Sequence, residues 1–266
     1  DVYIERYLND PRHVEVQILA DHHGHVYAIG DRDCSLQRRH QKIIEEAPAP
    51  FLSKRTRDNI LKAAAKGAKA AGYRSAGTLE FLVDKDGHFY FMEMNTRIQV
   101  EHPITEMTSN IDLVAWQLRI AMGEQLRLDD RDFESRGHAI ECRITAENAA
   151  TDFTPSVGTV STYVAPGGPG VRVDSHLYSG YQVPPFYDSL LAKVCVWGKD
   201  RTEAIDRMER ALRETIIDGV SHITPLHRLI LADEGFRRGD IHTGFVGQFL
   251  ERNYQQVVGA NQESMG

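Results

Sequence analysis

The segment from Glu93 to Pro103 holds the residue types most able to do chemistry, and it reads EMNTRIQVEHP. Successive side chains of an extended segment point to opposite sides, so residues two apart share a face. One face would carry the polar residues Glu93, Asn95, Arg97, Gln99 and Glu101, and the other Met94, Thr96, Ile98 and Val100. Two acids, an amide and a guanidinium on one face suit an anion bound beside a metal ion. The alternative is an amphipathic strand whose polar face meets water.

A second acid, Glu80, lies in a predicted hairpin with Glu93. Strands over 78–83 and 88–93 flank the turn residues of 84–87. If Val83 pairs with His88, or Lys85 with His88, the two glutamates lie on one face as opposite or diagonal neighbours. A shift of one residue would separate them, because it turns every side chain of a strand to the other face.

The glutamate pair predicts a cation. Two carboxylates about 4 Å apart repel by roughly 4 kcal/mol at an effective dielectric of about 20, so a buried pair needs a proton or a cation between them. Glu80, Glu93 and Asn95 offer only oxygen ligands, which favours Mg²⁺ or Mn²⁺ over zinc. Magnesium held by one or two carboxylates usually completes its shell with phosphates and water, so a nucleotide is expected. The alternative is two solvated glutamates on a surface hairpin.

Composition narrows the class of partner. The chain has 266 residues and a formal net charge of -7, which offers no broad positive field for nucleic acid. No apolar run approaches the ~18 residues of a membrane span, and no signal peptide pattern is present, so we expect a cytoplasmic protein without membrane contact. The three cysteines Cys34, Cys142 and Cys195 form no Cys-x-x-Cys pair and are expected to be free thiols.

The elements that position these residues follow from periodicity and turn signals. We expect strands over 2–8, 13–20, 26–29 and 136–144, and Gly/Pro-interrupted β structure over 154–197. The polar block 31–42 is either a charged surface loop or a basic rim on an anion site. The last residues, 255–266, are expected to be a disordered tail.

Five regions are predicted to be helical, three of them longer and two short. Ser53 would cap a helix to Ala71 that ends before Gly72. Asn110 would cap a helix to Met122 whose buried stripe is Ile111, Val114, Leu118 and Ala121. Thr202 would cap a helix with Ala204, Ile205, Met208 and Leu212 facing inward, and short helices would follow near Leu229 and Phe249.

Several motifs carry a family resemblance. Glu80 followed by Glu93-Met94-Asn95 resembles the metal signature of the ATP-grasp ligases. The motifs NTRIQVEHP at 95–103, RRHQK at 38–42 and RGHAIECR at 136–143 together resemble the biotin carboxylases of acyl-CoA carboxylases, of the acetyl-CoA carboxylase type. The resemblance implies an α+β fold, in which an ATP-grasp antiparallel sheet with flanking helices precedes a β-rich C-terminal subdomain. The implied domains are 1–125 and 126–254.

The resemblance also implies a role for each matching residue. Glu5 and Leu8 would meet the adenine of ATP, and His13, Gln37 and His40 its ribose and purine side. Glu80, Glu93 and Asn95 would hold the divalent ions. Lys42, Arg97, Gln99 and the Val100 backbone would bind bicarbonate, with Glu101 as the general base. Arg143 would stabilise the biotin enolate, and Asp188 matches a position near the biotin pocket.

The activity implied is the first half-reaction of an acyl-CoA carboxylase of fatty acid biosynthesis. ATP and bicarbonate would form carboxyphosphate, whose carbon dioxide is transferred to biotin on a biotin carboxyl carrier protein. Carboxyltransferase subunits and a second copy of the chain, as a homodimer, are the further partners implied. In the family an N-terminal domain and a lid precede the strand at which this chain begins, so we expect the chain alone to bind ATP weakly and turn over little.

Two other functions compete with this one. Another ATP-grasp ligase, such as one making carbamoyl phosphate, would share the acidic pair, although Arg97, Gln99, Glu101 and Arg143 in combination argue against it. A non-catalytic assembly module is the third, since domains in this position resemble those through which biotin carboxylases dimerise.

Overall fold

A computed structural model describes the chain except for residues 1, 3, 6, 129–134 and 264–266. At its centre is a mixed α/β arrangement built on one eight-stranded sheet of order β11-β13-β6-β3-β2-β1-β4-β5, in which neighbouring strands are antiparallel. The strands of this sheet are β1 Arg12–Ala20, β2 Val26–Arg38, β3 Gln41–Ala47, β4 Ser75–Val83, β5 Phe89–Asn95, β6 His138–Thr145, β11 Val171–Ser175 and β13 Leu190–Gly198.

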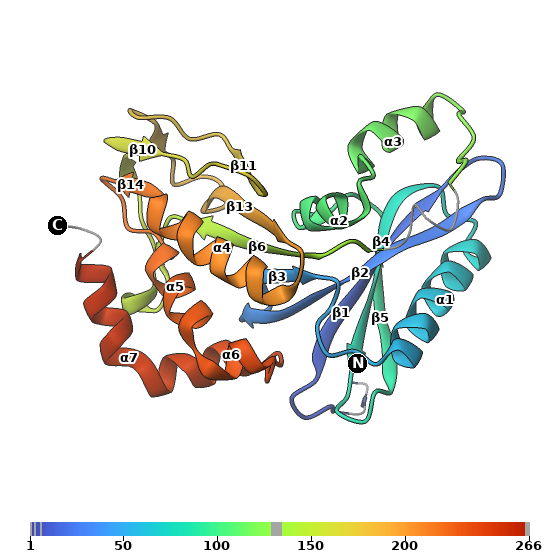
Figure 1. Ribbon diagram of the computed structural model, residues 1–266, viewed down its shortest axis with the longest axis horizontal. Coiled ribbons are helices and arrows are strands. Elements are labelled where there is room, and N and C mark those ends of the chain that lie inside the picture. The colour runs from blue at the N-terminus through green and yellow to red at the C-terminus, as the bar shows by residue number, and fades with distance from the viewer. Residues whose placement is uncertain (1, 3, 6, 129–134, 264–266) are drawn as a thin grey trace.

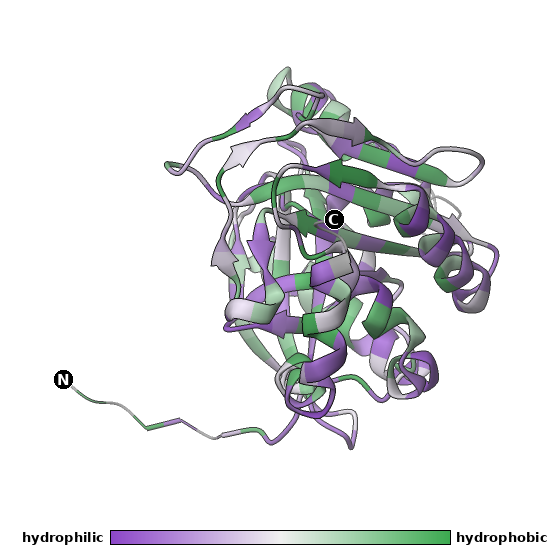
Figure 2. Cartoon of the chain, turned by 90° about the vertical axis from the view of Figure 1, so that its left-hand side faces the viewer, coloured by the Kyte–Doolittle hydropathy of each residue, from purple (hydrophilic) through white to green (hydrophobic). Residues whose placement is uncertain are grey.

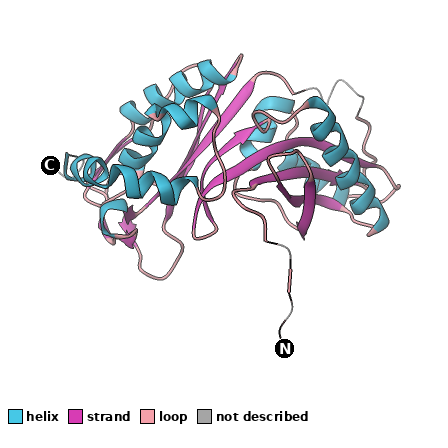
Figure 3. Ribbon diagram, turned by 90° about the horizontal axis from the view of Figure 1, so that it is seen from below, coloured by secondary structure: helices cyan, strands magenta, loops and turns pink. Residues whose placement is uncertain are grey.

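Helices cover the sheet (Figures 1 and 3). They are α1 Lys54–Ala70, α2 His102–Ser109, α3 Leu113–Ala121, α4 Arg201–Glu214, α5 Thr224–Ala232, α6 Glu234–Arg238 and α7 Phe245–Glu263. Smaller elements are β7 Glu147–Asn148, η2 Ala149–Thr151, β8 Thr154–Pro155, β9 Gly158–Thr159, β10 Thr162–Val164, β12 Gln182–Val183 and β14 Ile216–Asp218. None of the helices in the described part of the chain combines the length and apolar composition that a membrane crossing needs.

Alternation along two strands decides which face becomes core. On β1, Val14, Val16 and Ile18 pack against α1, while Glu15 and Gln17 point to the other face. On β6, the residues Ile140, Cys142 and Ile144 join the core beneath α4 and α5. The opposite face of β6 carries Glu141 and Arg143, and α2 packs there. We call the face with Glu15 and Glu141 the polar face, although Leu19 and Ala76 on this face pack against α3.

A β-bulge sets the register of the β4–β5 hairpin. Near the turn Val83 pairs with Phe89, a register that would place Glu80 opposite Met92 if it continued. The register shifts between Glu80 and Phe81, and Met92 is the extra residue, so Glu80 pairs directly with Glu93. The predicted juxtaposition of the two glutamates is confirmed, although neither of the turn pairings considered from the sequence occurs.

Several other predicted elements are confirmed. The side chain of Ser53 caps α1 by accepting from the Thr56 amide at 3.1 Å. Gly72 follows its end with a φ of +63°, the left-handed conformation that suits glycine. The strand containing Arg143 and the inward-facing residues of α4 are also as predicted. The three cysteines are free and buried.

Some predicted elements are wrong. The described residues of 2–8 form no strand and run away from the body (Figure 2). No described strand pairs with this segment, and an extended segment needs a partner to become part of a sheet. The polar block 31–42 is no surface loop, because most of it continues β2 with Arg32, Asp33 and Ser35 buried.

The helix predicted from Asn110 is two helices. Asn110 ends α2 in the left-handed conformation, with a φ of +59°, and Asp112 caps α3 by accepting from the Ala115 amide at 2.7 Å. Because α3 starts later than predicted, its buried face carries Leu113 and Ile120. Of the predicted stripe, Ile111 is buried, whereas Val114, Leu118 and Ala121 are exposed.

Two predictions near the C-terminus are also corrected. Asp200, and not Thr202, caps α4, since its side chain accepts from the Glu203 amide at 2.9 Å. The tail predicted from residue 255 is helical to Glu263, because Val257 and Asn261 are buried and hold this part of α7 against the body. Residues 264–266 lie outside the described part of the chain.

Candidate active site

A cavity of about 1050 Å³ opens on the polar face of the sheet. Its size is that of a pocket for a nucleotide-sized ligand. Among its lining residues are most of those predicted from the sequence, namely Leu8, His13, Gln37, His40, Lys42, Glu80, Glu93, Asn95, Arg97, Gln99, Val100, Glu101, Arg143 and Asp188. Glu5 is the exception, because it is exposed and does not line the cavity.

Glu80, Glu93 and Asn95 form an acid end of this cavity. The Asn95 Nδ2 atom lies 2.9 Å from Glu80 Oε1 and 3.3 Å from Glu93 Oε1, so one amide touches both carboxylates. Turning the amide over would present its oxygen beside the two carboxylate oxygens. This all-oxygen donor set fits a magnesium ion, which Glu80 and Glu93 would hold with Asn95 assisting.

Glu80 is held in its ionised form. His13 Nε2 lies 2.7 Å from Glu80 Oε2, and Gln99 Nε2 donates to Glu80 Oε1 at 2.7 Å. Burial raises the pKa of Glu80, but the hydrogen bond from His13 and the positive charge of Lys42 outweigh burial and lower this pKa to about 2. Glu80 is therefore a carboxylate at neutral pH.

Beside the acid end, Glu15, Glu80 and His13 bring their potential ligand atoms within 4.8 Å of one another. A cation of the protein already occupies this cluster, because Lys42 Nζ donates to Glu15 Oε2 at 2.7 Å and to Glu80 Oε1 at 3.4 Å. We therefore interpret the cluster as an ion-pair network and not as a second metal site.

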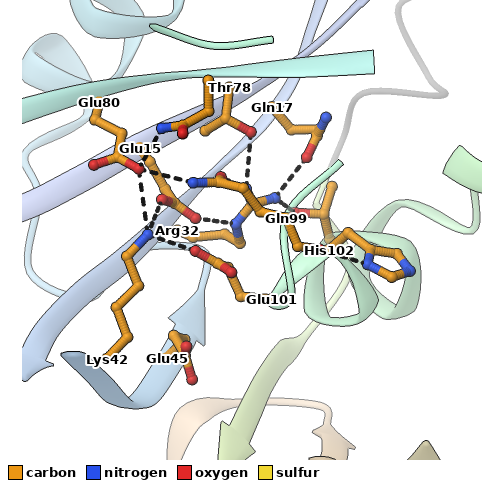
Figure 4. Close-up of polar contacts among 12 residues, drawn as sticks. Glu15, Gln17, Arg32, Lys42, Glu45, Thr78, Glu80, Gln99, Glu101 and His102 are labelled. Carbon is orange, nitrogen blue, oxygen red and sulfur yellow. Dashed lines mark hydrogen bonds and ion pairs between the residues drawn. The ribbon is translucent and has the colours of Figure 1, made fainter. Parts of the chain in front are cut away.

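Glu101 lies between two cations at the basic end of the cavity. Lys42 Nζ donates to Glu101 Oε1, and Arg143 Nη2 donates to Glu101 Oε2 at 2.9 Å (Figure 4 shows Lys42 and Glu101). Arg143 also donates from Nε to Glu45 Oε1 at 2.5 Å. Burial lowers the pKa of Lys42 and Arg143, but the surrounding carboxylates, including Glu101, outweigh burial and raise both. Both side chains are charged at neutral pH.

A buried arginine, Arg32, joins the strands under the cavity to the 96–101 loop and to α2, and no sequence motif indicated it. The Arg32 side chain is fully buried and donates from Nε to Glu15 Oε1 at 2.5 Å (Figure 4). It also donates to Gln17 Oε1 and Thr105 Oγ1 at 2.9 Å, and to Gln99 Oε1 at 3.0 Å. Arg32 thereby fastens the 96–101 loop and α2 to strands β1 and β2. Sequence alone gave no sign of this role, because Arg32 lies in the polar block that could have been a surface loop.

The 96–101 loop is held from the other side by Lys193 on β13. Lys193 Nζ donates to the Val100 carbonyl at 2.9 Å and lies 3.3 Å from Asp174 Oδ2. Arg97 on the same loop is exposed, and its guanidinium donates to the Ile98 carbonyl at 3.1 Å. Arg97 is thus accessible to an anion in the cavity.

The remaining predicted residues line the rim. His40 lies in the turn between β2 and β3 with a φ of +65°, and Gln37 precedes it on β2. Asp188 accepts from the Leu190 amide at 2.9 Å and so shapes its own loop. Thr243 and Gly244 also line the cavity, from just before α7, and no sequence motif indicated them.

Two family models match the chain. Residues 1–129 match the model described as "Carbamoyl-phosphate synthase L chain, ATP binding domain", and residues 141–248 match the "Biotin carboxylase C-terminal domain". The chain is also 53% identical over 249 residues to a biotin carboxylase of Pseudomonas aeruginosa. The chain is therefore similar to biotin carboxylases along nearly its whole length. It is similar as well to a pyruvate carboxylase subunit of Methanothermobacter thermautotrophicus, at 53% identity over 265 residues.

Solved structures agree with this similarity. The biotin carboxylase domain of the Hydrogenobacter thermophilus 2-oxoglutarate carboxylase, a dimer in complex with MgADP, ADP and bicarbonate, aligns with a TM-score of 0.91 and 46% identity over 95% of this chain and 55% of its own. A biotin carboxylase complex with a nucleotide from Campylobacter jejuni gives a TM-score of 0.89 and 45% identity over 92% of this chain and 54% of its own.

The chain is shorter than these relatives. The alignment with the Methanothermobacter protein includes 98% of this chain but 54% of that protein. The alignment with the Pseudomonas protein includes 94% of this chain but 55% of that protein. The chain therefore spans about half the length of the curated relatives that it matches.

Proposed function

We propose that this chain provides the metal, nucleotide, bicarbonate and biotin site of an enzyme that carboxylates biotin on a biotin carboxyl carrier protein, with ATP as the energy source. The observation that carries the proposal is the arrangement of one cavity. The oxygen donors Glu80, Glu93 and Asn95 line one end, and Glu101 between Lys42 and Arg143 lines the other. An anionic nucleotide with its metal and a small anion suit these two ends.

At the acid end, Glu80 and Glu93, assisted by Asn95, hold the divalent ion, magnesium or manganese. A bound ion of this kind would offset the negative charge of the ATP phosphates. Leu8, His13, Gln37 and His40 contact the adenine and ribose, and Glu5 belongs to the same proposal although it lies outside the cavity. His13 and Lys42 keep Glu80 ionised, so Glu80 can bind the ion without first losing a proton.

At the basic end, Lys42, Arg97, Gln99 and the Val100 backbone bind bicarbonate. The planar guanidinium of Arg97 matches a planar anion. Glu101 takes the proton of bicarbonate, and a bicarbonate oxygen then attacks the γ-phosphorus of ATP while the bond to ADP breaks. The products of this step are ADP and carboxyphosphate.

Carboxyphosphate breaks down to carbon dioxide and phosphate. The phosphate accepts the proton from the ureido nitrogen of biotin, and the biotin enolate that results attacks carbon dioxide to give carboxybiotin. Arg143 stabilises the enolate oxygen, which is the role of a fixed cation beside a developing negative charge. Asp188 shapes the loop at this side of the cavity.

The proposal extends to organisation and partners. Residues 1–125 form the nucleotide domain and 126–254 the C-terminal domain, although β3 and β6 pair across this division and make the sheet continuous. The chain forms a homodimer in the cytoplasm and works with a carrier protein and carboxyltransferase subunits in fatty acid biosynthesis. The dimeric carboxylase domain among its structural relatives supports the homodimer.

Labelled bicarbonate tests the reaction. The chain is incubated with ATP, magnesium, labelled bicarbonate and free biotin, and the labelled products are separated. Label on biotin that requires ATP supports the proposal. Label in carbamoyl phosphate when ammonia is added supports another ATP-grasp ligase. Failure of MgADP to bind in calorimetry, together with a dimer in sedimentation, would leave only an assembly module.

A further inference from the structure

Two glutamates lie side by side behind Arg143, away from the cavity lining. Glu45 on β3 pairs directly with Glu141 on β6, so their side chains share a face of the sheet. Both are fully buried. Glu141 pairs in turn with Cys195 on β13, so the three residues form one row across three strands.

Each carboxyl group has one satisfied and one unsatisfied oxygen. Glu45 Oε1 accepts from Arg143 Nε at 2.5 Å, and Glu141 Oε2 accepts from the Cys195 thiol at 3.3 Å. The other two oxygens, Glu45 Oε2 and Glu141 Oε1, are buried and have no hydrogen-bond partner within the described part of the chain. Buried polar atoms are rarely left unsatisfied in folded proteins.

One proton accounts for both unsatisfied oxygens. Opposed residues of antiparallel strands have Cβ atoms about 4.5–5.5 Å apart, and like charges in this position repel. A proton on Glu141 would remove the repulsion and turn Glu141 Oε1 into a donor for Glu45 Oε2. We propose that Glu45 and Glu141 share one proton at neutral pH, with Glu141 as the protonated donor and Glu45 as the ionised acceptor that positions Arg143.

The neighbours decide which residue carries the proton. Glu45 has the guanidinium of Arg143 as a direct partner, whereas Glu141 has a neutral thiol. Burial raises the pKa of Glu141 well above its usual value, and the charge of Glu45 raises it further. Burial also raises the pKa of Glu45, but the charge of Arg143 opposes this effect, so Glu45 is the more acidic of the two.

Other charged or titratable groups face this pair from every element packed against it. They are Cys34 on β2, Lys42 on β3, Arg143 on β6, Cys195 and Lys193 on β13, and Glu101 at the N-cap of α2. Lys42 binds Glu15 and Glu101, Arg143 binds Glu45 and Glu101, and Lys193 binds Asp174 and the Val100 carbonyl. Within the described residues, none of these three cations forms an ion pair with Glu141.

The consequence for chemistry rests on the proposed function. Arg143 bridges Glu45 and Glu101, so a fixed Glu45 carboxylate holds Arg143 in place when Glu101 changes its protonation state. Glu45 and Glu141 are thus positioning residues for the carboxylation of biotin. Neither lines the cavity.

Isotope-edited infrared spectroscopy tests the proton directly, without substrate or turnover. The whole chain is labelled with ¹³C at the carboxyl carbon of glutamate, because burial also raises the pKa of Asp31 and Asp33 and an aspartic acid would give a similar band. We expect a protonated-carboxyl band at neutral pH that shifts with the glutamate label. The absence of a label-sensitive band in the unsubstituted chain would overturn the proposal.

Glu141→Gln assigns the band, since glutamine mimics a neutral acid. The matched control is Glu147→Gln, because Glu147 is also buried but both of its oxygens accept, from Thr145 and Ser189 at 2.9 Å. The glutamate band should vanish in Glu141→Gln and remain in Glu147→Gln. A band that survives in Glu141→Gln would place the proton elsewhere.

Stability against pH gives a second readout. A buried acid whose pKa is raised on folding stabilises the fold below its unfolded pKa of about 4.5, and loses this contribution as pH rises through the folded value. Relative to Glu141→Gln, the unsubstituted chain should therefore become less stable as pH rises from about 5 to about 9. A difference between the two that does not change with pH would contradict the shared proton.

Activity separates this inference from the proposed function. If biotin carboxylation is measured, Glu45→Gln should lower kcat about tenfold or more and leave the KM for ATP within about twofold, as expected for the loss of an interaction made in the transition state. If kcat falls and the KM for ATP rises by the same factor, Glu45 is only structural. If the unsubstituted chain carboxylates no biotin and also binds no MgADP while the infrared band is present, the proposed function fails and the shared proton stands.

Discussion

The two ends of the cavity are built in opposite ways. At the acid end, Asn95 lies 15 and 2 residues along the chain from the glutamates that it contacts, and all three belong to one hairpin. At the basic end, Glu101 meets Lys42 and Arg143 across 59 and 42 residues. Glu93 is exposed, whereas Glu101 is buried. Ligand binding can therefore change at Glu93 with little effect on the fold, while chemistry and stability are coupled at Glu101.

The largest effect is expected at the basic end. Glu101→Gln removes the proposed base, and general base catalysis contributes about 10²–10⁴-fold in rate. We expect biotin carboxylation to fall by about that factor and MgADP affinity to stay within about twofold, measured by label transfer and calorimetry. An affinity loss as large as the rate loss would make Glu101 a structural residue and remove the contrast between the ends. Glu147→Gln serves as the control.

Arg32→Met tests how strongly stability depends on the buried network. Removing one partner of a buried ion pair typically costs about 3–5 kcal/mol, because the other charge stays buried without compensation. We expect a loss of that size in the free energy of unfolding, measured with denaturant. Arg97→Met, which changes an exposed arginine of the same cavity, should stay within about 0.5 kcal/mol. If Arg32→Met and Arg97→Met lower the free energy of unfolding by similar amounts, burial does not explain the contribution of Arg32 to stability.

In mild acid, the first loss of stability should come from buried histidines in the C-terminal half. Burial lowers the pKa of His227 on α5 to about 3 and that of His222 to about 4, from about 6.5 in the unfolded chain. The unfolded chain therefore binds the protons first, and stability should fall as pH drops from about 6.5 towards 3. The pKa of Glu80 is lowered to about 2, so the contribution of Glu80 is lost only between about pH 4.5 and 2.

Variants separate these contributions. His227→Gln should flatten the fall in unfolding free energy between about pH 6.5 and 4, and His88→Gln, at an exposed histidine, should leave it unchanged. Unfolding of the chain is followed by circular dichroism at each pH. An equal slope in His227→Gln and the unsubstituted chain would exclude His227 as the cause.

The smallest effect on the fold is expected at the acid end. Glu93→Gln removes one of two carboxylate ligands at an exposed position, so unfolding free energy should stay within about 0.5 kcal/mol. Magnesium-dependent ADP binding should weaken about tenfold, a loss of about 1.4 kcal/mol. Binding of ADP without magnesium is the internal control. If Glu93→Gln and the unsubstituted chain bind ADP equally well in the presence of magnesium, Glu93 is not a metal ligand.

The same contrast explains how much the sequence could predict. Strand alternation and the turn at 84–87 predicted that Glu80 and Glu93 face each other, and the structure reaches this pairing through a different register. The bulge at Met92, which achieves this register, was not predictable, since it depends on how β4 and β5 pack. The helix predicted from Asn110 failed for a similar reason, because burial of Leu113 and Ile120 follows from packing on β4.

The sequence by itself determined the chemistry available to this protein. The oxygen donors of the hairpin could be recognised from alternation along a strand, because backbone geometry sets that alternation. The Arg97 to Glu101 series and Arg143 could be recognised from residue types, although β5 ends at Asn95 and residues 96–101 form a loop instead of the predicted extended segment. Only the tertiary structure decided that Arg32 would be buried, that Lys42 would lie among carboxylates, and that Glu45 and Glu141 would lie opposite each other. These contacts join strands far apart in the sequence, and burial, which shifts pKa values and makes ion pairs matter, exists only after those strands have come together.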